Sequence, residues 1–127
     1  MLLALDISTS CTGYCIFDED KLIDIGSINL SKHKGLFDKA TQVKSDIIKL
    51  NKKHAITHVA VEENLQAFRP GLSSAKTLMT LAQFNGVVRW ICHERLEVPV
   101  EAINVNTARK SVGLKIDKKD KSKTTKE

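Results

Sequence analysis

The sequence predicts one α/β domain with a mixed five-stranded sheet flanked by helices. Three observations lead to this prediction. Three short strand-like segments follow one another at the N-terminus, an amphipathic helix comes next, and a later apolar strand ends, like the first, in a carboxylate. Short connections make the first three strands antiparallel, whereas a helical crossover makes the fourth strand parallel to the first.

Length and composition also indicate a single globular domain. The chain has 127 residues, of which 42% are hydrophobic and 28% charged, which suits one modest core. It lacks a bilayer-spanning apolar segment and the features of a signal peptide, so we expect no membrane association and a location in bacterial or phage-infected host cytoplasm. Three cysteines without a CxxC pair, and histidines without a zinc-binding spacing, fit a reducing compartment.

The first strand carries the first candidate site residue. Leu2–Leu5 is an unbroken apolar run, typical of a strand near the centre of a sheet, and Asp6 follows it directly. Burying that charge requires a partner or a metal ion. Asp6 is therefore either a turn former or a functional carboxylate.

Two more strands and a helix follow. Gly13–Asp18 and the alternating Leu22–Leu30 predict strands two and three of an antiparallel meander. A helix follows them, predicted by a single apolar stripe, with the lysines of the segment outside the stripe. The stripe consists of Leu36, Ala40, Val43, Ile47 and Leu50.

The fourth strand supplies a second carboxylate. The segment 58–62 is a short apolar run that ends in Glu62. Since open α/β sheets place their sites at the carboxyl ends of parallel strands, we expect Asp6 and Glu62 to lie together. The strand offers no cation to pair with a purely structural Glu62, which favours a functional role.

The long helix predicted for Ser73–Arg95 spreads apolar residues over more than one face. One face can hold Leu78, Leu81, Ala82, Val88 and Ile91, and the other holds Met79, Phe84, Val87 and Trp90. That exceeds what one contact with the sheet requires, so a second helix or a partner subunit should cover the excess. Ala82 and Gly86, four residues apart, would allow another backbone to approach closely. We therefore predict a homodimer through this helix.

The remaining segments suggest contacts with an anionic partner, which a net charge of +5 permits. Phe68 and Arg69 lie in the loop before the long helix; Phe68 either packs on the core or wedges into an opened base step, with Arg69 on phosphate. A fifth strand at 100–103 precedes a short helix bearing Arg109 and Lys110. The tail from residue 115 is either solvated or a segment that orders on DNA. The tail residues placed with the DNA-binding set are Lys115, Lys118, Lys119, Lys121 and Lys123.

Together these residues resemble the RuvC-type Holliday-junction resolvases of the RNase H-like superfamily. The resemblance rests on Leu3–Asp6 with Thr12–Tyr14, on Val59–Glu62, on the helix at 75–88, and on the basic segment Val100–Gly113. It covers essentially the whole chain. It implies an RNase H-like nuclease domain at 1–114 and a basic tail at 115–127 that begins a DNA-contacting segment.

The resemblance implies an activity and a cofactor. By position, Asp6 and Glu62 correspond to the first two acids of a four-acid cluster that holds two Mg²⁺ or Mn²⁺ ions. Such an endonuclease hydrolyses phosphodiesters of four-way junctions or other branched DNA. Oxygen ligands suit these hard cations, and two ions can activate a water and stabilise the leaving oxygen. The family's long helix forms its dimer interface.

The chain departs from the family pattern after the basic segment. The family takes its last two acids from a final helix, and we expect this chain to stop before it. Asp117 and Asp120 have the family's spacing but lie among lysines, so they are not assigned as ligands. We therefore expect the 127-residue form to bind branched DNA and to cleave it poorly.

Two other functions remain open. The first is a non-catalytic RNase H-like DNA-binding or scaffold protein. The second is a fragment of an actin-like ATPase or kinase, in which the segment from Asp6 to Gly13 would act as a phosphate loop. Divalent-metal binding that depends on Asp6 would separate the nuclease from the scaffold, and stabilisation by ATP would favour the kinase.

Overall fold

A computed structural model of the chain describes residues 1–63 and 75–104. In chain order the elements are β1 (Leu2–Asp6), β2 (Cys11–Asp18), β3 (Lys21–Asn29), α1 (Leu36–His54), β4 (His58–Glu63), α2 (Ala75–Leu96) and β5 (Val100–Asn104). The five strands form one sheet in the order β3-β2-β1-β4-β5. β1 is antiparallel to β2 and parallel to β4, and β4 is parallel to β5. The mixed sheet predicted from the sequence is confirmed.

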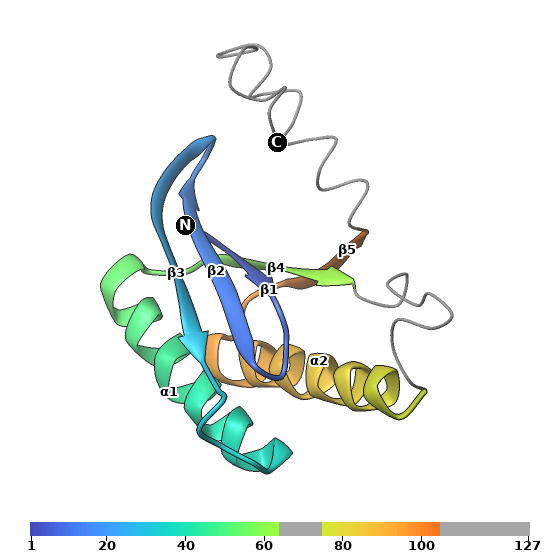
Figure 1. Cartoon of the computed structure of the whole chain (residues 1–127). Coiled ribbons are helices and arrows are strands. Elements are labelled where there is room, and N and C mark those ends of the chain that lie inside the picture. The colour runs from blue at the N-terminus through green and yellow to red at the C-terminus, as the bar shows by residue number, and fades with distance from the viewer. Residues whose placement is uncertain (64–74, 105–127) are drawn as a thin grey trace, which may run out of the picture.

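Both helices pack on the same face of the sheet (Figure 1). Alternate residues of the central strands point into this layer and are fully or almost fully buried, such as Leu3, Leu5 and Val61. Val43 on α1 and Phe84 on α2 meet them and are also fully buried. The residues between them in β1 and β4 therefore face the opposite side, where the sheet is open in the described part of the chain.

Helix α1 follows the predicted apolar stripe. Its buried residues are four of the five predicted positions, Ala40, Val43, Ile47 and Leu50, with His54 one turn further on, while Leu36 is partly buried. The helix therefore extends a turn beyond the predicted stripe. It ends where Ala55 adopts a left-handed conformation with φ 51° and donates its N–H to the carbonyl of Asn51.

The expected faces of helix α2 need correction. Phe84, expected on the outer face, is fully buried, whereas Ala82, expected on the inner face, is exposed. Apolar side chains occur all around this helix, so the sequence pattern does not select one face. Neither described helix is both long and apolar enough to cross a membrane.

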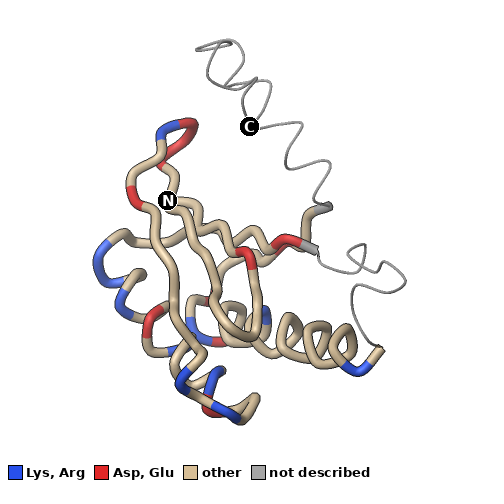
Figure 2. The backbone as a smooth tube through the Cα atoms, viewed as in Figure 1, with Lys and Arg blue, Asp and Glu red and all other residues tan. Residues whose placement is uncertain are grey.

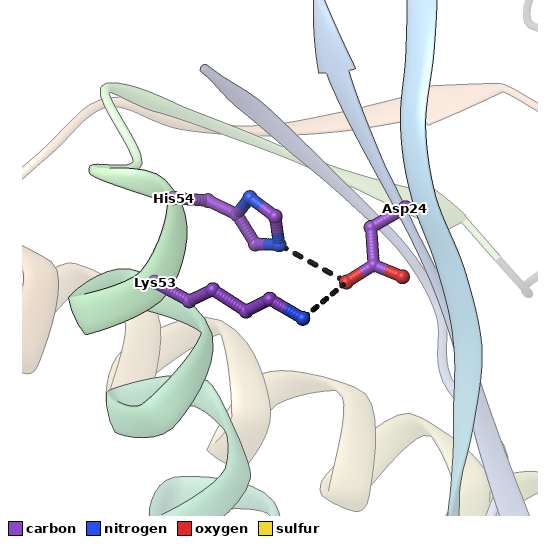
Figure 3. Close-up of polar contacts among 3 residues, drawn as sticks. All are labelled: Asp24, Lys53 and His54. Atoms are coloured by element: carbon purple, nitrogen blue, oxygen red, sulfur yellow. Dashed lines mark hydrogen bonds and ion pairs between the residues drawn. The ribbon is translucent and has the colours of Figure 1, made fainter.

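Strand β3 is connected to α1 through the carboxylate of Asp24 (Figure 3). His54 Nε2 lies 3.0 Å and Lys53 Nζ lies 3.9 Å from Asp24 Oδ2. The hydrogen bond with His54 is the main reason that the pKa of Asp24 is lowered, and the charge of Lys53 lowers it further. His54 is almost completely buried, so the contact fixes the end of α1 to the edge of the sheet.

This contact predicts a pH-dependent contribution to stability. A carboxyl group whose pKa is lowered by folding stabilises the fold above its unfolded pKa of about 3.9, and this contribution is lost as pH falls through the lower folded pKa. Asp24→Asn should therefore be less stable than wild type at pH 6, and the difference should shrink well below pH ~4. Urea unfolding at several pH values measures it.

Asp18→Asn, at the exposed end of β2, is the matched control and should show no such trend. If the difference between wild type and Asp24→Asn is the same at pH 6 and in acid, the carboxylate of Asp24 makes no pH-dependent contribution to stability.

Candidate functional site

Asp6 ends strand β1 on the open face of the sheet. Leu3 and Leu5 point into the helix layer, so alternation places Ala4 and Asp6 on the other side. The Asp6 side chain is exposed, and the side chain of the next residue, Ile7, is buried in the core.

Glu62 lies at the matching position of β4. The parallel register pairs Leu5 with Val61, so the next position in each strand places Asp6 beside Glu62. Val61 is fully buried toward the helices, which directs Glu62 to the open face. The backbone oxygen of Glu62 accepts a hydrogen bond from Asn85 Nδ2 at 3.3 Å, and this contact links the end of β4 to α2.

The two carboxylates line the same hollow, which has a volume of about 350 Å³. Its floor consists of small residues from the three central strands, including Ala4, Gly13 and Ala60, and Ile25 and Ile103 lie at its sides. Among the described residues, no lysine or arginine lines it. Figure 2 likewise shows acidic residues at the ends of β1 and β4, whereas the basic residues of the described chain lie on the helices, on the connections and at the start of β3. The described part of the site is therefore negatively charged and open.

This arrangement suits a hard cation. Mg²⁺ is commonly held by one or two carboxylates together with waters and substrate phosphates, and Asp6 and Glu62 can supply such a pair. The described residues contain no group of three or more acidic, histidine or cysteine side chains that could hold a metal. Cys15 also lines the hollow, but burial raises its pKa, which keeps the thiol protonated and disfavours it as a ligand.

The turn between β1 and β2 is fixed by a buried hydroxyl. The Thr12 side chain is fully buried; its hydroxyl donates to the carbonyl of Ser8 at 3.0 Å and accepts from the N–H of Ser8 at 3.4 Å. These bonds close the turn directly after Asp6. Strand β2 starts at Cys11, two residues earlier than predicted, because Cys11 and Thr12 pair with β3.

Several predicted positions lie outside the described residues. They are the end of the nuclease domain at 114, the basic tail at 115–127, and all nine residues expected to bind DNA: Phe68, Arg69, Arg109, Lys110, Lys115, Lys118, Lys119, Lys121 and Lys123. Their roles stay predictions. The structure also identifies two residues near the acids to which the sequence reading assigned no role in the site, Thr12 and Gly13. Thr12 could have been recognised as a polar residue among apolar strand residues. Gly13 could have been recognised from the hairpin register, which places it opposite Asp6.

Comparison with solved structures identifies the fold. Thermus thermophilus RuvC in complex with a Holliday junction substrate matches with a TM-score of 0.69 at 16% sequence identity, over 86% of this chain and 67% of that one. Another T. thermophilus RuvC structure matches with a TM-score of 0.56 at 17% identity, over 81% of this chain and 63% of that one. The chain thus has the RNase H-like fold of RuvC.

A third similar structure comes from a eukaryote. The yeast mitochondrial Holliday junction resolvase Ydc2 matches with a TM-score of 0.54 at 16% identity, over 81% of this chain and 50% of that one. The chain therefore spans between half and about two thirds of the length of these three proteins. No protein-family model and no curated protein matches its sequence.

The hydrogen bonds of Thr12 lead to a stability prediction. Thr12→Val keeps the side-chain shape but leaves the N–H and carbonyl of Ser8 without their partner, which should lower the free energy of unfolding by about 1–2 kcal/mol. Thr12→Ser keeps the hydroxyl and should lose less. Urea unfolding of both variants tests the role of the hydroxyl; Thr12→Val being as stable as Thr12→Ser would show that these bonds contribute nothing.

Proposed function

We propose that this chain is the nuclease domain of a metal-dependent endonuclease that acts on branched DNA, such as a four-way junction. The observation that carries this proposal is the shared hollow of Asp6 and Glu62 at the ends of two adjacent parallel strands. The fold adds support, since a similar structure is described in complex with a Holliday junction substrate. A soluble scaffold would have no need to place two carboxylates in one open hollow.

The residues of the hollow suit a DNA strand together with a divalent ion. Mg²⁺ or Mn²⁺, when bound, supplies activation of water and stabilisation of the leaving oxygen. Asp6 and Glu62 attract the cation and oppose a phosphate in its absence, so metal and DNA should bind together. The small residues of the floor leave the carboxylates accessible from the open face.

The number of acids limits the activity that we propose. Two carboxylates of the described residues face the hollow, and a pair of ions needs more oxygen ligands than two side chains offer. DNA phosphates and water can provide part of this coordination. We therefore propose that this chain binds branched DNA well and cleaves it poorly, with Phe68, Arg69 and the basic residues after Ile103 contacting the DNA.

The metal site can be tested without cleavage. Asp6→Asn removes one anionic ligand, so the affinity for Mn²⁺ should fall by roughly tenfold or more. Calorimetric titration of the folded protein with Mn²⁺ measures this, and a labelled synthetic junction tests for nicking in parallel. We expect wild type to bind Mn²⁺ and Asp6→Asn to lose both binding and any nicking.

Asp18→Asn changes the same charge at the other end of β2 and should bind Mn²⁺ like wild type. Equal Mn²⁺ affinity in Asp6→Asn and Asp18→Asn would contradict the proposal. Junction binding by wild type without any Mn²⁺ binding would instead identify a DNA-binding scaffold.

We further propose that two copies of the chain pair through α2. Met79 and Trp90 on this helix are 63% and 61% exposed, and Phe37 on α1 is 77% exposed. Phe37 and Trp90 line an apolar groove of about 800 Å³ between the two helices. Exposed apolar surface of this kind marks an interaction site, and a two-fold dimer covers the same patch on both copies.

This proposal predicts a dimer that depends on Trp90. Sedimentation at tens of micromolar should show a dimer for wild type and a monomer for Trp90→Ser, because the substitution removes the largest exposed apolar side chain of α2. Ile25→Ser is the matched control, since Ile25 is 66% exposed on β3 and should leave the dimer intact. A monomeric wild type, or a Trp90→Ser dimer, would exclude this interface.

A further inference from the structure

Gly13 occupies the position directly opposite Asp6 in the sheet. The antiparallel register of β1 and β2 pairs these two residues, and both line the hollow. Residues that lie opposite each other in neighbouring strands face the same side of the sheet. A side chain at position 13 would therefore stand next to the Asp6 carboxylate, on the side away from Glu62.

The fold itself does not require glycine at this position. Among the described residues, a Cβ atom built on Gly13 meets one atom within 4 Å, the Cβ of Asp6 at 3.9 Å, which is an ordinary contact. The φ angle of Gly13 lies outside the left-handed region that favours glycine. Glycine inside a strand weakens it and often marks a place where a ligand approaches closely.

Gly26 on β3 illustrates the opposite case. A Cβ atom there would lie 2.5 Å from the hydroxyl oxygen and 2.7 Å from Cζ of Tyr14. Glycine at position 26 is therefore explained by packing in the helix layer. Gly13 has no such contact with a described residue, and the space above it opens into the hollow beside a carboxylate.

We propose that Gly13 is a specificity-determining residue that keeps room beside Asp6 for a hydrated divalent cation and the DNA phosphate that accompanies it. Mg²⁺ retains several waters when proteins bind it, so a single ion needs more space than its carboxylate contacts alone. A side chain at position 13 would take part of this space without disturbing the core. The inference rests on the proposed function, because it assigns Gly13 a role at the same site.

The test compares Gly13→Ala and Gly13→Val with wild type in two measurements, thermal unfolding and calorimetric titration with Mn²⁺. Both variants should unfold at the wild-type temperature or above it, because Ala and Val reduce the flexibility of the unfolded chain and Val also favours strands. The Mn²⁺ affinity of Gly13→Val should fall by roughly tenfold or more. Gly13→Ala should show a smaller loss.

Gly35→Ala provides the control for the general effect of replacing glycine. Gly35 lies outside the hollow, before α1, with an extended backbone at φ −91° and ψ 151°. The Mn²⁺ affinity of the Gly35→Ala variant should equal that of wild type. Mn²⁺ affinity in Gly13→Val equal to wild type would overturn the role of Gly13 and leave the metal site intact.

Two other outcomes also decide the matter. A clear fall in the unfolding temperature of both Gly13 variants would show that the position is needed for packing, which overturns the inference. Absence of Mn²⁺ binding by the wild-type chain would overturn the proposed metal site, and with it the role of Gly13.

Discussion

The parallel pairing of β1 with β4 is the constraint on which the site depends. A strand alternates its side chains between two faces, so a shift of one residue would turn Glu62 into the helix layer and leave Asp6 alone. The buried side chains of Val59 and Val61 oppose that shift, because it would expose both of them. Core packing thus fixes the position of two carboxylates that do not belong to the core.

The sequence was sufficient for the sheet because each strand has a clear signal. Apolar runs, short connections and one helical crossover determine strand order and direction. The same reasoning placed Asp6 and Glu62 on one edge of the sheet, and the structure brings them into one hollow. Their role as metal ligands stays a prediction, because a pair of adjacent carboxylates is necessary for that role but does not establish it.

Other features could not be read from the sequence. The faces of α2 were assigned wrongly for Phe84 and Ala82, since apolar residues surround that helix and tertiary packing alone selects the buried side. The hydrogen bonds of Thr12 depend on the geometry of the turn, which hydropathy does not encode. Gly13 became informative once the register showed which residue it faces and what surrounds it.

The two faces of the described sheet differ in their role. The face toward α1 and α2 holds the close-packed side chains, whereas the carboxylates project from the other face. Substitutions on the outward face can therefore alter the surroundings of the carboxylates while the packed layer stays the same, and repacking beneath the helices need not disturb the acids. Such a division lets each face of the sheet tolerate substitution separately, which is consistent with a shared fold at 16% identity.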